Sequence, residues 1–227
     1  MRSKGQGAAN TYEAINDRIL SFQLQPNTQL SESALAQEIQ VSRTIVREAL
    51  QHLEDDGLIE KTGQRWTVTA MTEKDIYEIC QVREALECKA VEVILKNGGL
   101  TPGQIRNLRQ INECSYQSDD YVLNYSMDGR FHATLCEYSN NSRLIAYFDK
   151  LALQMERTRW LTMVLPKNDP RKEHEQIIKA LEDNDLVKAR DSVEKHLLSA
   201  EKNFVKIFSD DTLWCAYNSF KSFISEK

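Results

Sequence analysis

Hydrophobic residues recur with helical spacing near the start of the chain. Ile15 and Ile19 lie four residues apart, and Leu35 and Ile39 repeat that interval further on. Ser31 precedes the second group and suits a helix N-cap, because its hydroxyl can accept a backbone N–H of the first turn. The pattern therefore predicts two helices in this segment.

The next segment combines a third helix with a hairpin. Ser42 has the position of a second N-cap, and Gly57 ends the helix. The apolar positions of this helix are Ile45, Val46, Ala49, Leu50 and Leu53. Two β-prone runs, 58–61 and 65–69, flank a turn that contains Gly63, which predicts a β-hairpin. Three helices followed by a hairpin are the layout of a winged helix-turn-helix.

From residue 72 onward the apolar pattern is helical throughout, without a strong strand signal. Short polar, Gly or Pro connectors separate the predicted helices, which lie near 72–96, 101–115, 119–139, 142–162, 169–183, 185–207 and 210–224. Long helices with short connectors favour an antiparallel bundle. We therefore expect a mainly α protein with a winged helix-turn-helix in residues 1–71 and an all-helical bundle in residues 72–227.

Composition places the chain among ordinary globular proteins. Its 227 residues are 41% hydrophobic and 28% charged, and no apolar run is long enough for a membrane span. The opening residues, MRSKGQGAAN, lack the apolar stretch of a signal peptide and predict a short disordered lead. The five scattered cysteines include no CxxC pair, so free thiols in a reducing cytoplasm are expected.

The charge balance by itself does not suggest nucleic acid. The net charge is −5, and residues 1–70 carry seven Lys and Arg against nine Asp and Glu, which is −2. A nucleic-acid-binding domain is usually basic. If residues 1–71 bind DNA, their positive charge must therefore gather on one face.

Such a face is predicted at the start of the third helix. Arg43 and Arg47 are four residues apart and lie on one helix face, where an arginine can contact guanine through two hydrogen bonds. The hydroxyls of Ser42 and Thr44 at the helix N-terminus suit a phosphate. The alternative is that both arginines are simply solvated on the exposed face of an amphipathic helix. On the predicted wing, the DNA-contacting candidates are Lys61, Gly63, Gln64 and Arg65.

The whole string from residue 30 to residue 59 resembles the GntR family of bacterial regulators. The segments LSE, LA, VSRT, VREAL and DGLI match the family signature. The sequence departs from it at Gln40, where the family has a turn glycine and a left-handed backbone is required, and at Ile45 in place of proline. Many relatives carry an arginine near Ser33, which could still contact a phosphate. The resemblance implies binding to double-stranded DNA.

Three histidines in the helical segment suggest a metal site. His132, His174 and His196 lie on or beside apolar helix faces, and Asp128 shares a face with His132. Three imidazoles and one carboxylate could converge on a divalent metal, with Zn the first choice and Ni, Fe or Mn as others. The alternative is a set of hydrogen-bonded core histidines.

The same residues resemble the FCD domain, the effector domain of FadR-type GntR regulators. The segments DGRFH, EHEQI and VEKHL match its histidine helices, and this implies the metal role of Asp128, His132, His174 and His196. The resemblance also implies a small carboxylic acid, sugar acid or amino acid as effector. Arg83 could bind its carboxylate, or could instead form a salt bridge with Glu84, Glu87 or another helix.

These inferences predict a cytoplasmic homodimeric regulator, more often a repressor, that binds a palindromic operator and responds to the effector. One alternative is a metal-dependent enzyme acting on a small carboxylic acid, although no HExxH arrangement supplies a general base. Another is a protein–protein adaptor, against which the two arginines argue. The protein is therefore not expected to be an enzyme.

Overall fold

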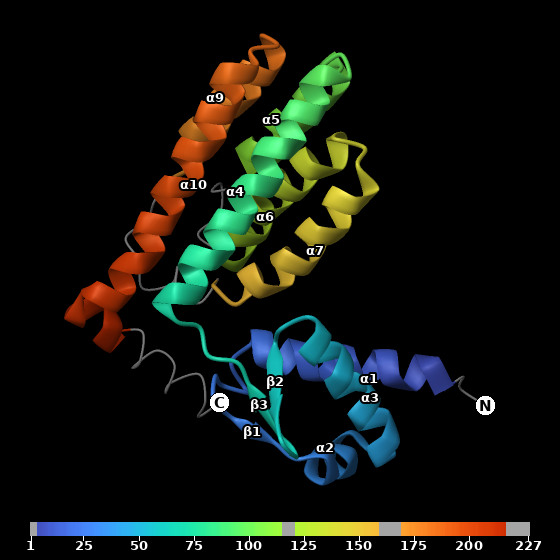
Figure 1. Ribbon diagram of the computed structural model, residues 1–227. Coiled ribbons are helices and arrows are strands. Elements are labelled where there is room, and N and C mark those ends of the chain that lie inside the picture. Colours follow the sequence, from blue (N-terminus) through green and yellow to red (C-terminus); the bar gives the residue numbers. More distant parts are fainter. Residues whose placement is uncertain (1–3, 115–120, 159–168, 217–227) are drawn as a thin grey trace. The chain divides into compact units, whose positions relative to one another are not determined.

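Three helices and a small sheet form the N-terminal unit of the computed structural model (Figure 1), which describes residues 4–114, 121–158 and 169–216. A second unit begins at Glu73. The N-terminal elements are α1 (Lys4–Leu20), β1 (Gln29–Leu30), α2 (Glu32–Ile39), α3 (Arg43–Asp55), β2 (Ile59–Thr62) and β3 (Arg65–Val68). Buried apolar side chains from all three helices and the sheet form one core.

Local capping explains where α2 and α3 begin. The Ser31 hydroxyl accepts the Ala34 backbone N–H at 3.4 Å, and the Ser42 hydroxyl accepts that of Ile45 at 3.4 Å. Gln40 closes α2 in the left-handed region, with φ 59° and ψ 44°. The left-handed backbone expected at this non-glycine position is therefore present.

The expected disordered lead was wrong from Lys4 onward, because α1 begins there. The glycines of this segment are poor helix formers, but packing overrides that preference. Ala8 is buried, and a Cβ placed on Gly7 would lie 3.4 Å from the Ile45 side chain. Contact with α3 therefore accounts for a helix that propensity does not predict.

The sheet has three antiparallel strands in the order β1-β3-β2. The predicted hairpin is present, with Thr62 paired to Arg65 across the turn and Gly63 at φ 64°. The edge strand β1 was not predicted. It has only two residues, too few for any alternation to show, and it forms because Leu30 pairs with Trp66 of β3.

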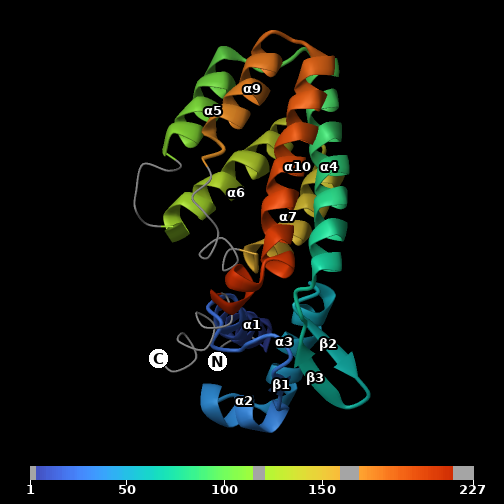
Figure 2. The same ribbon diagram turned by 90° about the vertical axis from the view of Figure 1, so that its left-hand side faces the viewer.

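The second unit is a helical bundle, which confirms the predicted class of fold. Its elements are α4 (Glu73–Lys96), α5 (Pro102–Cys114), α6 (Tyr121–Tyr138), α7 (Ser142–Glu156), α9 (Arg171–Glu182) and α10 (Leu186–Ser209). Helices α4 and α10 lie side by side along their length (Figure 2). A further helix begins at Asp211. Residues 115, 119–120, 159–162 and 217–224 of the predicted helices lie outside the described residues.

The core of the bundle contains polar side chains at its centre. Its apolar residues come from α4, α5, α6, α9 and α10, with Phe131 and Leu135 of α6 fully buried. The buried polar side chains of this unit include three histidines, Arg83 and Glu87, which need partners in this setting. None of the described helices is both long and apolar enough to cross a membrane.

Candidate metal centre and DNA-binding surface

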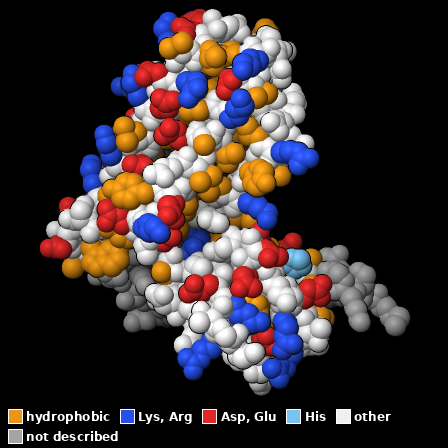
Figure 3. Space-filling view, viewed as in Figure 1, with side chains coloured by type: hydrophobic (Ala, Val, Ile, Leu, Met, Phe, Trp, Pro, Cys, Tyr) orange, Lys and Arg blue, Asp and Glu red, His pale blue; other side chains and the backbone are white. Residues whose placement is uncertain are grey.

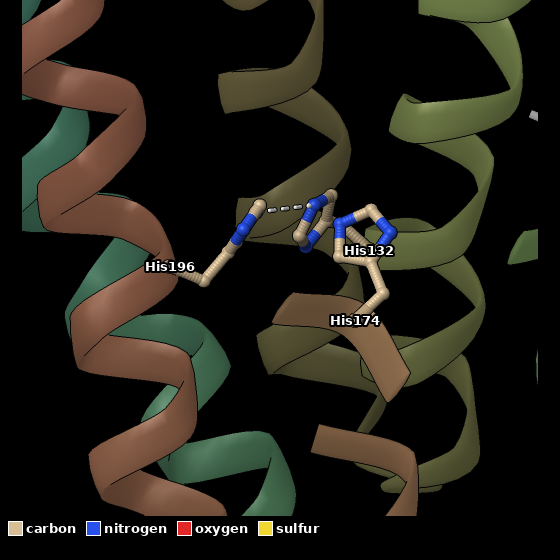
Figure 4. A group of neighbouring side chains, drawn as sticks. All are labelled: His132, His174 and His196. Atoms are coloured by element: carbon tan, nitrogen blue, oxygen red, sulfur yellow. Dashed lines mark hydrogen bonds between the residues drawn. The ribbon is translucent and has the colours of Figure 1, made fainter. Parts of the chain in front are cut away.

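Three imidazole rings converge inside the bundle. His132 of α6, His174 of α9 and His196 of α10 point toward one another (Figure 4), and each offers a ring nitrogen within 4.8 Å of the others. Their exposed fractions are 0%, 0% and 4%. The structure therefore brings together the three histidines that the sequence placed on three separate inward faces.

Each ring is oriented by a hydrogen bond at Nδ1. His132 Nδ1 lies 2.7 Å from Oε2 of Glu87, and His196 Nδ1 lies 2.8 Å from Oε2 of Glu173. His174 Nδ1 lies 3.0 Å from Oδ1 of Asn112. Since these partners are acceptors, they favour the tautomer with hydrogen on Nδ1 and a lone pair on Nε2, as in metal-binding histidines.

The Nε2 atoms fit a cation. Those of His132 and His196 are 3.2 Å apart, and two lone pairs at that distance repel unless a proton or a metal ion lies between them. The buried Nε2 of His174 has no hydrogen-bond partner within the parts of the chain that the structure describes. Burial lowers the pKa of the His174 ring well below its usual value, and the nearby charges of His132 and His196 add to this. The ring therefore keeps the lone pair that a metal requires.

Asp128 lies beside the three rings, one turn before His132 on α6. Its carboxylate oxygens lie 3.9 Å from Nε2 of His132 and 3.6 Å from Nε2 of His174. The side chain is 21% exposed, so this carboxylate forms the open side of the cluster. Three nitrogen donors and one oxygen donor suit Zn and several other first-row divalent metals.

A buried ion pair supports the cluster from α4. The Nε of Arg83 donates to Oε1 of Glu87 at 2.5 Å, and the two side chains are 4% and 0% exposed. Burial opposes ionisation of Glu87, but its contacts with His132 and Arg83 outweigh this and lower the pKa of Glu87 to about 2. Of the two roles left open for Arg83, the structure shows the salt bridge with Glu87.

Sequence reasoning did not predict the residues that orient the rings. Glu87 was considered only as a partner of Arg83, and its contact with His132 depends on how α4 packs on α6. Glu173 adjoins His174 but faces His196, a contact between α9 and α10. No sequence signal points to Asn112, which also donates to the carbonyl of Arg171 at 3.0 Å.

In the N-terminal unit, the predicted DNA-contacting residues share exposure to solvent. All nine are exposed: Ser33, Ser42, Arg43, Thr44, Arg47, Lys61, Gly63, Gln64 and Arg65. Lys and Arg side chains gather where α2 and the hairpin end, with acidic side chains between them (Figure 3). The Ser42 hydroxyl is already used as a helix cap, and Lys61 Nζ lies 4.5 Å from the ring centre of Trp66.

Glu32 of α2, which was not predicted from the sequence, contacts both the arginines of α3 and Trp66 of the hairpin. It accepts two hydrogen bonds from Arg47, at 3.0 Å from Nε and 2.7 Å from Nη2. The indole Nε1 of Trp66 donates to the same carboxylate at 3.1 Å, and Nη2 of Arg43 lies 3.7 Å away. The hydrogen bond from Arg47 is the main reason that the pKa of Glu32 falls to about 2.

The two units define the class of winged-helix proteins with a helical C-terminal unit. Residues 8–68 match the family of bacterial regulatory proteins called gntR, and residues 78–199 match the FCD domain. The chain therefore belongs to the GntR family of bacterial regulatory proteins, in the branch that carries an FCD domain.

Curated relatives are transcription regulators rather than enzymes, as expected for this chain. YdhC of Bacillus subtilis, an HTH-type regulator, is 27% identical over 136 residues, which are 59% of this chain and 61% of YdhC. The gluconate operon repressor of Bacillus licheniformis is 30% identical over 61% of this chain and 58% of its own length. The chain thus spans about three fifths of these two relatives. Over 89% of this chain and 91% of its own length, the repressor RspR of Escherichia coli is 24% identical.

Solved structures of regulators share the fold. McbR/YncC of E. coli superposes with a TM-score of 0.71 at 21% identity, covering 92% of this chain and all of that one. A GntR regulator from Rhodococcus sp. RHA1 has a TM-score of 0.68 at 22% identity, covering 88% and 97% of the two chains. These likenesses confirm the architecture of both units.

Proposed function

We propose that this protein is a metal-containing transcription repressor that responds to a small carboxylate. In this proposal residues 1–71 bind DNA, and residues 72–227 bind metal and effector and form a homodimer. The observation that carries it is the convergence of three histidine Nε2 atoms, each ring oriented by a separate acceptor at Nδ1. A purely structural core has no need to bring three histidine Nε2 atoms together, one of them buried without a hydrogen-bond partner in the described residues.

The metal would be held by His132, His174, His196 and Asp128. Zn is the first choice because the donor set has three nitrogens and one oxygen, and Ni, Fe or Mn would also accept it. A bound metal would supply a positive charge that an effector carboxylate can approach. The chain itself contributes the orientation of the rings, the partly open position of Asp128 and the exclusion of bulk water from the cluster.

A carboxylate effector is supported by chemistry and by one relative. The relative from Bacillus licheniformis is by name a repressor of the gluconate operon, and gluconate is a sugar acid. Arg83 is the second candidate contact, and binding an effector there would have to compete with or extend its pair with Glu87. Sugar acids, other small carboxylic acids and amino acids all carry the required group.

Control of DNA binding would follow from coupling between effector and DNA. A homodimer presents two copies of α3, and a palindromic operator presents two matching half-sites. An effector can release the operator only if it binds more tightly to a dimer arrangement that fits the operator poorly. Carboxylate binding is therefore expected to lower operator affinity, and operator binding to lower carboxylate affinity by the same factor.

Elemental analysis and thermal shift test the metal and effector together. The purified protein should contain close to one equivalent of divalent metal per chain, and one small carboxylic acid should raise its melting temperature. A chelator should abolish that rise, since the metal is part of the binding site. Absence of metal both after purification and after reconstitution would contradict the proposal for the C-terminal unit while leaving DNA binding intact.

Replacing Arg43 with alanine should weaken binding to the cognate operator by about 1–3 kcal/mol and relax its base preference. The side chain is 66% exposed at the start of α3, and its 3.7 Å contact with Glu32 is weak enough to let it reach a base edge. Fluorescence anisotropy with an operator selected from a random duplex library measures the loss. Lys61→Ala is the control: it should lower the salt dependence of binding with little change in base preference. Equal loss on all sequences for Arg43→Ala would assign this arginine to phosphate instead.

A further inference from the structure

Arg47 uses one edge of its guanidinium within the protein and leaves the other edge outward. Nε and Nη2 donate to the two carboxylate oxygens of Glu32, at 3.0 and 2.7 Å. A guanidinium has five donors in a rigid plane, so the edge formed by Nη1 and the second hydrogen of Nη2 remains for another partner. The side chain is 54% exposed, so a partner can reach that edge.

Glu32 is itself held in place. Its side chain is only 13% exposed, and Oε1 also accepts the indole N–H of Trp66, a residue 1% exposed in the core of the winged helix. Because the Glu32 carboxylate is held by these contacts, it restrains the side chain of Arg47. Exposed ion pairs usually add little to stability, but this one is bidentate and has a third, buried donor.

Arg43 differs from Arg47 in this respect. Its nearest contact with Glu32 is 3.7 Å, its side chain is 66% exposed, and it makes no bidentate pair within the described residues. Of the two arginines on this face, Arg47 alone is oriented before DNA arrives. An oriented donor pair loses less side-chain freedom on binding and tolerates fewer acceptor geometries.

We propose that Glu32 is a specificity-determining positioning residue, which holds Arg47 so that its outer edge can read the O6 and N7 acceptors of a guanine in the major groove. This inference rests on the proposed DNA-binding function and goes beyond it by naming the base and the residue that fixes the reader. The wing takes part through Trp66, which links the hairpin to the same carboxylate.

Because Glu32 is negatively charged, the proposal predicts different effects of its neutralisation on random-sequence binding and on base preference. A carboxylate repels DNA phosphates, so neutralising it should leave binding to random-sequence DNA unchanged or stronger. Freeing Arg47 should at the same time weaken the preference for guanine. A variant that is merely misfolded would instead lose affinity for both kinds of DNA.

The experiment compares four full-length proteins: wild type, Glu32→Gln, Arg47→Ala and Glu38→Gln. Glu38 is the matched control, because it lies on the same helix, is 59% exposed and pairs with Arg18 rather than with a recognition arginine. Selection from a random duplex library with the wild type defines the operator. Each guanine of that operator is then replaced by 7-deazaguanine, which lacks the N7 acceptor, and affinities are measured by competition.

Replacing one particular guanine in each half-site should lower the affinity of the wild-type protein for the operator about tenfold or more, within the range for a bidentate base contact. Arg47→Ala should show almost no loss at that guanine, and Glu32→Gln about threefold or less. Glu38→Gln should behave as the wild type. Binding of Glu32→Gln to random-sequence DNA should equal or exceed that of the wild type.

If Glu32→Gln discriminates against 7-deazaguanine as strongly as the wild type, while Arg47→Ala does not, the proposed role of Glu32 is wrong. The proposed function would be unaffected by that result. Failure of the wild type to select any sequence would overturn the proposed function itself. If Glu32→Gln does not fold, Glu32→Asp replaces it. In the free wild-type protein, the NMR signal of the Arg47 Nε–H should exchange slowly with water, and rapid exchange would contradict the restraint.

Discussion

Replacing Glu87 with alanine is expected to lower the free energy of unfolding by about 3–5 kcal/mol. The change removes the carboxylate partner of a guanidinium that is 4% exposed, and a buried charge without its partner is strongly destabilising. It also removes the acceptor of His132 Nδ1. Urea denaturation of the metal-free protein, followed by the signal of the helical unit, measures the effect.

Glu92→Ala on the same helix is the control. Glu92 pairs with Lys89 and Lys96, but those lysines are exposed, so the loss of Glu92 should destabilise the protein far less than the loss of Glu87. A combined Arg83→Met and Glu87→Leu variant should recover much of the stability, because apolar side chains of similar size do not leave a charge behind. If Glu87→Ala costs no more than Glu92→Ala, the Arg83–Glu87 pair does not contribute as the structure indicates.

His174→Ala is expected to remove stoichiometric metal from the protein. Its Nε2 is buried without a hydrogen-bond partner in the described parts of the chain and faces the other two rings. Losing one of three nitrogen donors leaves too few ligands for a tight site. Elemental analysis of folded protein after reconstitution and desalting measures the occupancy, and the chelator should no longer change its melting temperature.

Two further variants are compared with His174→Ala. His52→Ala removes an exposed histidine of the N-terminal unit and should retain full occupancy. Asn112→Ala keeps all four ligands but removes the acceptor at His174 Nδ1, so metal affinity should fall by about 10- to 100-fold rather than vanish. Full metal occupancy in His174→Ala would exclude this residue as a ligand.

The fold was accessible from sequence wherever its signals were local. The caps at Ser31 and Ser42, the Gly63 turn and the helical periodicity after residue 72 each act within a few residues, and the structure contains the corresponding elements. The sequence did not predict two features of the fold, because these depend on residues far away in the chain. Helix α1 extends to Lys4 because of packing beside Ile45, and the two-residue strand β1 exists only through β3.

For the site, periodicity could place each histidine on an inward face but could not bring the faces together. The sequence alone determined the winged helix, the bundle and the three buried rings, because spacing decides which side of a helix is apolar. Only the packing of α4, α5, α6, α9 and α10 decided that Glu87, Asn112 and Glu173 orient those rings. It likewise decided that Glu32 holds Arg47. Such contacts join residues far apart in the chain, and their geometry arises when the helices dock.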